Sequence, residues 1–405
     1  MGSSGREKTP SLGGGWGGWD WCDVYNFVWS VYTTPIRQAL LVEVRTDDGL
    51  TGWGEGGSGT LSRAGAVFVE DVLAPLAVGE DPFDLDRIGQ KVATTLDRAG
   101  WTGDFGVQAW SGLEVALWDV MGKAVGRPVS QLLGGRVRDR VMAYATGLYY
   151  VPTAPDPTSA RQEEARGYVE RGYRAMKMKV GGLAPSDDLR EVAGIRRAIG
   201  DDVLLMADAN CAYDSRTAIQ VGQGLEEHGV AWFEEPVQRG DLEGYLEVRR
   251  ALRMPITGGE HLGSLDAFRE YVARRVVDVA QPDVANCGGL SGARRIAALA
   301  RAFYVRVFPH VWGTPVAIAA GLHFAATLPS MPPTRTPTPL AQEPLFEFDS
   351  TPHPIRDAML TDSLRPKDGW LAVPEGPGLG VEVDLDVIRH FAVRRGVRVY
   401  GAGLL

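Results

Sequence analysis

The sequence predicts an α/β protein in which a closed barrel of parallel strands follows a smaller α+β domain. From about residue 140, eight short apolar runs rich in β-branched residues alternate with amphipathic helical stretches. The chain has 405 residues, enough for a barrel of roughly 250 residues and one companion domain. Seven consecutive runs end in an ionisable residue, as expected where barrel strands run into the loops that carry chemistry.

The composition and net charge of the chain exclude several kinds of binding partner. Hydrophobic residues make up 44% and charged residues 23% of the chain, which is typical of a globular protein. A net charge of −9 and a pI of about 5.3 argue against nucleic acid or an anionic membrane as the main partner. No apolar run reaches the roughly 18 residues of a membrane span, and the first 19 residues do not resemble a secretory signal. Cys22, Cys211 and Cys287 form no CxxC motif, so we expect a reducing cytoplasm.

The first domain is expected over residues 1–138. Residues 1–19 are glycine-rich and are expected to be mobile. Residues 39–45 and 50–55 alternate as two strands joined by an Asp-Gly turn, which predicts a hairpin. The pattern over residues 63–135 is helical.

The barrel is expected over residues 139–355. Its strands are predicted at 141–146, 175–180, 203–207, 231–233, 256–258, 276–281, 305–309 and 345–348, and its helices at 161–171, 187–198, 215–227, 242–252, 265–273, 291–303 and 314–326. A doubly wound open sheet is the alternative, but no GxGxxG follows a first strand. Residues 356–405 are too few for a domain and are expected to return to the first domain or to cap the barrel.

Ionisable and polar side chains at the predicted strand ends define a candidate site. They are Lys177, Lys179, Asp208, Asn210, Glu234, Glu235, Glu260, Asp283, His310 and Glu347. From Lys179 to His310 the successive separations are about one βα unit each. Any single carboxylate after a strand can be a helix cap or turn residue, but the full series favours one shared site.

Three of these carboxylates predict a metal site. Asp208, Glu234 and Glu260 end three adjacent strands, and carboxylates that share one volume resist ionisation unless a cation is present. Oxygen ligands without cysteine or paired histidine suit Mg²⁺, with Mn²⁺ possible. A solvated acidic rim is the alternative.

Lys177 and Lys179 lie two residues apart on one predicted strand, so their side chains point the same way. Neighbouring ammonium groups that are partly desolvated lower each other's pKa, which would let one act as a base near neutral pH. A salt-bridged pair on the outer face is the alternative, and it would turn Met176 and Met178 inward.

His310 and Asp283 follow neighbouring strands, and a carboxylate beside an imidazole raises the imidazole pKa and fixes its tautomer. A packed, purely structural histidine is the alternative. His261 adjoins Glu260 and could also reach the pocket.

These residues, in this order, resemble the enolase superfamily and within it the mandelate racemase-like group, also called the mandelate racemase/muconate lactonizing enzyme family. The similarity covers about residues 39–395. The matching segments are Trp53-Gly-Glu55, Ala116-Leu-Trp-Asp119, Gln131-Leu-Leu-Gly-Gly135, Lys177-Met-Lys179, Asp208-Ala-Asn210, Phe233-Glu-Glu-Pro236, Gly258-Gly-Glu260, Gln281-Pro-Asp283 and Pro309-His310. Residues 143–147, 309–314 and 346–349 look like those of sugar-acid lactone cycloisomerases and acid-sugar dehydratases.

The resemblance implies a modified TIM barrel, (β/α)₇β, with an α+β capping domain completed by the C-terminal segment. It implies Mg²⁺ on the three carboxylates and abstraction of a proton α to a carboxylate through a metal-stabilised enediolate. The resemblance assigns acid and base roles to Lys179 and to the dyad of His310 and Asp283. It implies that Lys177 contacts the substrate carboxylate and that Glu347 forms a hydrogen bond with the same carboxylate. Asn210 and His261 are further candidates for substrate binding.

The leading functional hypothesis is a Mg²⁺-dependent acid-sugar dehydratase, a lyase that yields a 2-keto-3-deoxy acid. A sugar-acid lactone cycloisomerase and a racemase or epimerase are alternatives on the same site, and a non-catalytic binding protein is a remote one. The expected partner is a small carboxylate substrate, with no nucleic acid and no membrane, in a homo-oligomer. Residues 1–38 match the family poorly, and residues 13–21 and 57–63 are where capping loops should close over the substrate.

Overall fold

The computed structural model describes residues 27–28, 33–34, 37–57, 62–151 and 154–392. The glycine-rich start at 1–19, the segment 13–21, Cys22 and most of the predicted capping loop 57–63 lie outside these residues. Cys211 and Cys287 are free thiols. No helix in the described ranges is both long and apolar enough to cross a membrane.

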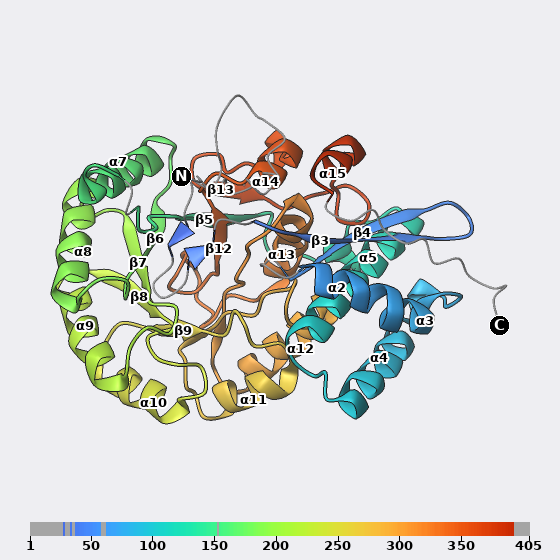
Figure 1. Cartoon of the computed structure of the whole chain (residues 1–405), viewed down its shortest axis with the longest axis horizontal. Coiled ribbons are helices and arrows are strands. Elements are labelled where there is room, and N and C mark those ends of the chain that lie inside the picture. The colour runs from blue at the N-terminus through green and yellow to red at the C-terminus, as the bar shows by residue number, and fades with distance from the viewer. Residues whose placement is uncertain (1–26, 29–32, 35–36, 58–61, 152–153, 393–405) are drawn as a thin grey trace, which may run out of the picture.

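Eight parallel strands of the described chain form the curled sheet of the barrel, and β13 (Trp370–Ala372) extends it by pairing antiparallel with β5. The order is β11-β10-β9-β8-β7-β6-β5-β12. The strands are β5 (Arg140–Thr146), β6 (Ala175–Lys179), β7 (Leu204–Asp208), β8 (Val230–Glu234), β9 (Ile256–Gly258), β10 (Val279–Ala280), β11 (Arg306–Val307) and β12 (Leu345–Asp349). The fold is the expected modified TIM barrel with a capping domain (Figure 1).

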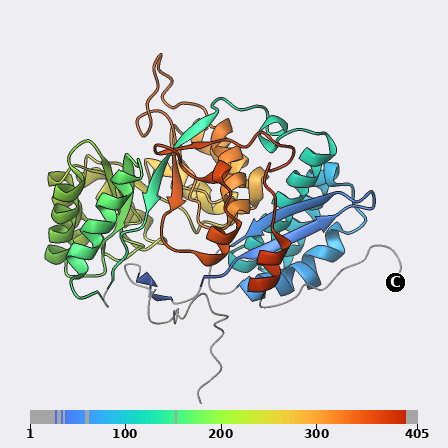
Figure 2. The same ribbon diagram turned by 90° about the horizontal axis from the view of Figure 1, so that it is seen from above.

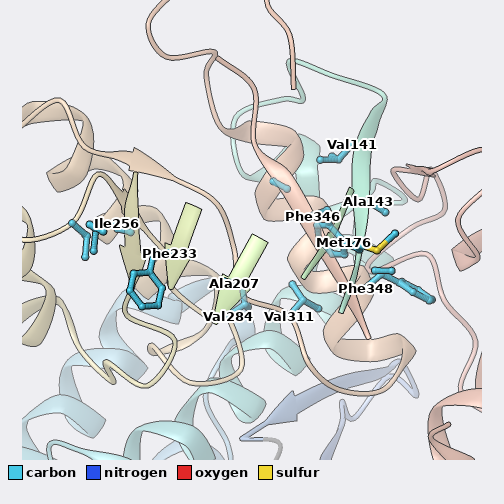
Figure 3. Close-up of a cluster of buried hydrophobic side chains, with 14 of the residues drawn as sticks. Val141, Ala143, Met176, Ala207, Phe233, Ile256, Val284, Val311, Phe346 and Phe348 are labelled. Atoms are coloured by element: carbon cyan, nitrogen blue, oxygen red, sulfur yellow. The ribbon is translucent and has the colours of Figure 1, made fainter. Parts of the chain in front are cut away.

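Helices cover the outside of the barrel (Figure 1). They are α7 (Pro157–Glu170), α8 (Pro185–Ile199), α9 (Ser215–Glu227), α10 (Leu242–Ala251), α11 (Leu265–Ala273), α12 (Gly289–Ala302) and α13 (Pro315–Thr327). Alternate strand residues face these helices, including Met176, Ala207, Phe233 and Phe346, and they form the large core cluster of Figure 3. Met176 therefore points outward, contrary to the alternative in which the lysines lie on the outer face.

The barrel interior is layered along the strands. A closed apolar layer contains Tyr144, Ala175, Met206, Trp232, Val279, Phe308 and Leu345. Because strand side chains alternate, the residue two positions further on points into the barrel as well. Two positions after Ala175, Met206, Trp232 and Leu345 stand Lys177, Asp208, Glu234 and Glu347, so a charged layer follows the apolar one.

Two strands are much shorter than the sequence pattern predicts. The runs 276–281 and 305–309 contribute only two ladder residues each, in β10 and β11. In each case the residue two positions after the end of the preceding helix, Arg275 or Tyr304, has a positive φ. The next amide, of Val276 or Val305, then hydrogen-bonds back to the helix, so the first apolar residue of the run closes a helix instead of starting a strand.

The capping domain packs a hairpin on a long helix. Strands β3 (Leu40–Arg45) and β4 (Thr51–Gly56) pair antiparallel as expected, and β4 lies on α5 (Asp104–Ala124). Gly54 must be glycine, since a Cβ there would come within 1.9 Å of the Gly112 carbonyl oxygen. The other elements are β1 (Phe27–Val28), β2 (Thr33–Thr34), α2 (Ser62–Phe68), η1 (Val69–Leu73), α3 (Ala74–Ala77), η2 (Pro82–Asp84), α4 (Leu85–Ala99) and α6 (Val129–Leu132).

The C-terminal segment connects the two parts. After β12 come α14 (Pro354–Met359), η3 (Asp362–Leu364), β13 and α15 (Leu385–Phe391), and Figure 2 shows this red segment passing between the barrel and the capping domain. The Leu379 amide donates to the Asp119 carboxylate of α5 over 2.7 Å, and the Val129 amide donates to the Gly378 carbonyl. The segment therefore packs on the first domain.

Candidate active site

Strand β6 carries both lysines into the barrel. Lys177 and Lys179 are 1% and 4% exposed, and their ammonium groups are held by carboxylates of β7, β8 and β12. Lys177 Nζ lies 2.5 Å from Glu234 Oε1 and 2.9 Å from Glu347 Oε1, and Lys179 Nζ donates to Asp208 Oδ2. The strand pattern thus places both lysines inside, with a carboxylate beside each.

The three candidate metal ligands converge. Asp208, Glu234 and Glu260 are buried, and one carboxylate oxygen from each lies within 4.8 Å of the other two. Trp232 Nε1 and Gln281 Nε2 donate to Glu234 Oε2 over 3.1 and 2.9 Å, and these bonds orient the carboxylate. A triad of oxygen ligands at this spacing could hold a divalent cation, because hard cations prefer oxygen donors.

The charges around the triad also favour a divalent cation. Five buried carboxylates, of Asp208, Glu234, Glu260, Asp283 and Glu347, meet three bases, Lys177, Lys179 and His310. If all five carboxylates ionise, two negative charges remain in a buried volume even with all three bases protonated, and such an excess is costly without a counter-ion. Burial raises the pKa of Glu234, Lys177 lowers it and Asp208 raises it further. The net result is a pKa of about 8.

The dyad forms as the sequence predicts. His310 Nδ1 lies 2.6 Å from Asp283 Oδ2, and the two residues pair as a parallel bridge. His310 Nε2 points to the triad, 3.4 Å from Glu260 Oε2 and 3.6 Å from Glu347 Oε2. Burial alone would lower the pKa of His310, but Glu347, Glu260 and Asp283 raise it to about 10.

Glu347 links the two sides of the site. Its Oε1 accepts from Thr146 Oγ1 over 2.5 Å and contacts Lys177, while its Oε2 accepts from the Val311 amide over 3.3 Å and faces His310. The carboxylate therefore touches groups of β5 and β6 on one side and of the loop after β11 on the other.

The two remaining candidates lie next to the metal ligands. The Asn210 amide donates to Asp208 Oδ1 over 2.9 Å, and Asn210 adopts a positive φ of 43°. His261 Nε2 lies 3.0 Å from Glu260 Oε1, and its side chain is half exposed. Glu235, which follows Glu234, accepts from Cys211 Sγ over 3.5 Å.

The lysine electrostatics correct one expectation. Burial and the neighbouring Lys177 lower the pKa of Lys179, as predicted, but Asp208 raises it, and the net shift is upward. Burial likewise lowers the pKa of Lys177, whereas Glu234 and Glu347 raise it well above its ordinary value. Among the protein's own groups, the carboxylates outweigh the second ammonium, and the lysines are held in the charged form.

Sequence reasoning missed three residues of the site. Trp232 and Gln281 orient Glu234, and Tyr149 is a buried residue whose ring centroid lies 5.6 Å from Lys179 Nζ. Trp232 could have been found, because it precedes Glu234 by two residues and so shares its face of β8. Tyr149 lies in a loop, where no periodicity indicates a direction.

Comparisons with known proteins agree with this geometry. Residues 23–134 match the mandelate racemase / muconate lactonizing enzyme N-terminal domain, and residues 160–387 match the enolase C-terminal domain-like family. The D-galactarolactone cycloisomerase of Agrobacterium fabrum is 38% identical over 88% of this chain and 91% of its own length. The arabinonate dehydratase of Saccharolobus solfataricus is 33% identical over 87% and 90%.

A solved structure shows the same architecture. The 3,6-anhydro-D-galactonate cycloisomerase from Zobellia galactanivorans superposes with a TM-score of 0.79 and 35% identity, covering 87% of this chain and 93% of its own. Both family models match in the expected order, and each covers the part of the chain where the corresponding domain is found. The chain therefore belongs to the mandelate racemase/muconate lactonizing enzyme family of the enolase superfamily.

Proposed function

We propose that this lyase or isomerase is an acid-sugar dehydratase, which removes the proton α to a sugar-acid carboxylate and expels the β-hydroxyl as water. One observation carries the proposal: a buried lysine and a histidine–aspartate dyad contact the same carboxylate triad. Lys179 contacts it at Asp208 and His310 at Glu260. A substrate carboxylate at the triad would then have a base and an acid within reach.

Lys179 is the proposed base. It accepts the α-proton on Nζ, the C–H electron pair passes into the carboxylate, and an enediolate forms. A divalent cation on Asp208, Glu234 and Glu260 would neutralise the charge that develops on the substrate carboxylate, and Mg²⁺ suits this donor set. It would also offset the Asp208 charge that raises the pKa of Lys179.

His310 is the proposed acid. As an imidazolium it donates its Nε2 proton to the β-oxygen while the C–O bond breaks, and water leaves. The resulting enol becomes a 2-keto-3-deoxy acid. Asp283 holds Nδ1 at 2.6 Å, which fixes the ring and favours its charged form. Burial lowers the pKa of His310, but Glu347, Glu260 and Asp283 raise it to about 10. The imidazole therefore keeps this proton at neutral pH.

Lys177 and Glu347 are the proposed contacts for the substrate carboxylate, with Asn210 and His261 as further binding groups. Lys177 is a fully buried cation beside the triad. Glu347 lies between Lys177 and His310. To hydrogen-bond the substrate carboxylate it would have to donate as a protonated acid: burial favours that form, whereas Lys177 and His310 hold its pKa below the usual value. Asn210 Oδ1 is buried without a hydrogen-bond partner within the described residues, so it can accept from a substrate hydroxyl.

A sugar-acid lactone cycloisomerase is the second candidate. The 38% and 35% identities to two cycloisomerases favour it. The two proton transfers are the same, but the leaving oxygen is the ring oxygen of the lactone. It stays attached to the product, and no water is lost.

The test is a screen of hexaric, hexonic and pentonic acids and their lactones with Mg²⁺ in D₂O. Semicarbazide detects 2-keto acids, and NMR detects deuterium at the α-carbon. A keto acid from an open-chain acid supports dehydration, and a keto acid from lactones alone supports cycloisomerisation. Deuterated epimer without keto acid would replace both with epimerase chemistry. The absence of keto acid and of exchange across the panel would contradict the proposal.

A further inference from the structure

The capping domain holds the two loops that carry the dyad. Asp283 and His310 follow the two-residue strands β10 and β11, so little of the sheet ladder fixes them. Each loop leads into a barrel helix, α12 or α13, and the first turn of each helix is bonded to a buried carboxylate of the capping domain. These carboxylates are Glu114 of α5 and Glu55 of β4.

Glu55 binds the first turn of α13 through three donors. Its Oε2 accepts from the Thr314 amide over 3.0 Å, the Thr314 hydroxyl over 2.5 Å and the Ala317 amide over 3.2 Å. The first turn of a helix has amides without intrahelical partners and the positive end of the helix dipole, so a carboxylate is stabilising there. The Glu55 side chain is 1% exposed, and the contact joins residues 259 positions apart.

Only three residues separate His310 from this anchor. At the first of them, the Val311 amide donates to Glu347 Oε2 over 3.3 Å. At the last, Gly313 lies so close to Glu55 that a Cβ would come within 2.6 Å of its Oε1. The segment is thus held at one end by Glu347 of the barrel and at the other by Glu55 of the capping domain, and His310 is the residue directly before it.

The end of β4 also contacts the Asp283 loop. The Gly57 amide donates to the Ala285 carbonyl over 2.9 Å, and the Ala285 amide donates to Asp283 Oδ1 over 2.7 Å. Two residues of one short stretch, Glu55 and Gly57, therefore reach the loops of both dyad members.

We propose that Glu55 is a positioning residue for His310: by anchoring the first turn of α13, it fixes where the imidazole stands relative to the carboxylate triad. The alternative is a purely structural contact that stabilises the interface between the domains. The two roles predict different effects of changing Glu55. A positioning role affects the proton transfer of His310 more than that of Lys179, whereas a structural role lowers the stability of the protein and affects both transfers equally. The catalytic part of the proposal rests on the proposed function.

The first test compares Glu55→Gln with wild type in D₂O with Mg²⁺ and a sugar acid that the wild type converts. Two rates are measured: deuterium entry at the α-carbon of recovered substrate, which reports Lys179, and product formation, which also needs His310. Because an error of about 1 Å in position can cost about 100-fold in rate, we expect the ratio of exchange to product to rise about tenfold or more, with KM changed little. An unchanged ratio, with both rates lowered together, would overturn the proposal.

Asp119→Asn is the matched control. Asp119 is also a buried carboxylate of the capping domain, and it accepts from the amides of Trp53 and Leu379 over 2.8 and 2.7 Å. None of these partners lies in the loops of the dyad. We expect Asp119→Asn to lower the melting temperature and to leave the exchange-to-product ratio unchanged. A rise in the ratio as large as that of Glu55→Gln would show that loosening the interface alone is sufficient.

Milder variants serve if Glu55→Gln does not fold. Thr314→Ala removes the hydroxyl that donates to Glu55 and to which the Val316 amide is bonded, and we expect a smaller rise of the same ratio. Thr314→Ser keeps the hydroxyl and should restore the wild-type value. Equal ratios in the alanine and serine variants would contradict the proposal.

A second readout needs no substrate. Amide hydrogen exchange of the full-length, Mg²⁺-loaded protein should become faster in residues 311–317 of Glu55→Gln and stay unchanged in residues 175–179 of β6. Unchanged exchange in residues 311–317 would overturn the anchoring. If the wild type converts no sugar acid, the proposed function fails, and this measurement still decides whether Glu55 fixes the segment after His310.

Discussion

The strand that carries the two lysines and the strands that lead to Asp283 and His310 are held by different parts of the molecule. Strand β6 has five residues and pairs with β5 on one side and β7 on the other. Strands β10 and β11 have two residues each, and carboxylates of the capping domain anchor the helices that follow them. The lysine side is thus fixed by the barrel and the histidine side by the interface between the domains.

Polar groups of the barrel itself also fix the end of β6. The buried Arg161 of α7 donates to the carbonyls of Leu148 and Lys179, both over 2.8 Å. Asp188 of α8 accepts from the Gly181 amide over 2.7 Å and from the Tyr150 hydroxyl over 2.5 Å. None of these partners belongs to the capping domain, so the lysine side should tolerate changes at the domain interface that disturb the histidine side.

The largest effect should come from the lysine side. Replacing Lys179 with alanine removes the proposed base, and we expect kcat to fall by about 10⁴-fold, while calorimetry still detects Mg²⁺ binding at the triad. Lys367→Ala, at an exposed position, should leave both quantities unchanged. Turnover that survives in Lys179→Ala would contradict the assignment of the base.

Replacing His310 with asparagine should separate the two sides. Asparagine can still reach Asp283 but cannot act as a general acid, so we expect product formation to fall by about 10² to 10³-fold. Lys179 is unchanged, so deuterium should still enter the α-carbon in D₂O. If exchange disappears together with product, the two sides do not act separately, and the comparison fails.

Mg²⁺ should stabilise both sides together, because Asp208 touches Lys179 and Glu260 touches His310. At a concentration of 100 times Kd, a ligand of the folded state adds about 2.7 kcal/mol to the free energy of unfolding. We therefore expect Mg²⁺ to raise the melting temperature and EDTA to lower it. Asp208→Asn should weaken the response, and a wild-type protein indifferent to both reagents would contradict the metal site.

The same contrast explains what the sequence could predict. Lys177 and Lys179 were predictable because alternation along AMKMK puts both on one face of a strand. Asp208, Glu234 and Glu260 were predictable because each βα unit returns the chain to the same rim of the barrel. These inferences need only local periodicity and the repeat of the fold.

The support of the histidine side was not predictable in this way. Glu55 stands in a strand and Glu114 in a helix, where the sequence pattern indicates burial but not the partner. Their contacts span 259 and 176 positions and depend on how two domains pack. The short lengths of β10 and β11 were not predictable for a related reason. An apolar residue that closes a helix and one that starts a strand look alike in sequence.

The smallest predicted effect concerns Glu114, which binds the first turn of α12. Its carboxylate accepts from the amides of Leu290 and Ser291 over 2.8 and 3.0 Å and from Trp118 Nε1 over 2.7 Å. Burial nevertheless raises its pKa from 4.5 to about 7, although these hydrogen bonds oppose the shift. Between these two values the folded protein binds more protons at Glu114 than the unfolded chain does, so the contribution of Glu114 to stability decreases as pH rises.

From pH 5 to pH 7 this decrease amounts to about 2 kcal/mol of the free energy of unfolding. Glu114→Gln cannot ionise, so its unfolding free energy should fall less over this range than that of wild type, as measured by urea denaturation at both values. Glu382→Gln, at an exposed position, should keep the wild-type slope. A Glu114→Gln variant with the same slope as wild type would mean that this carboxylate is ionised throughout, with the α12 amides offsetting the cost of its burial. The capping domain would then hold the Asp283 side through a charged carboxylate at every pH tested.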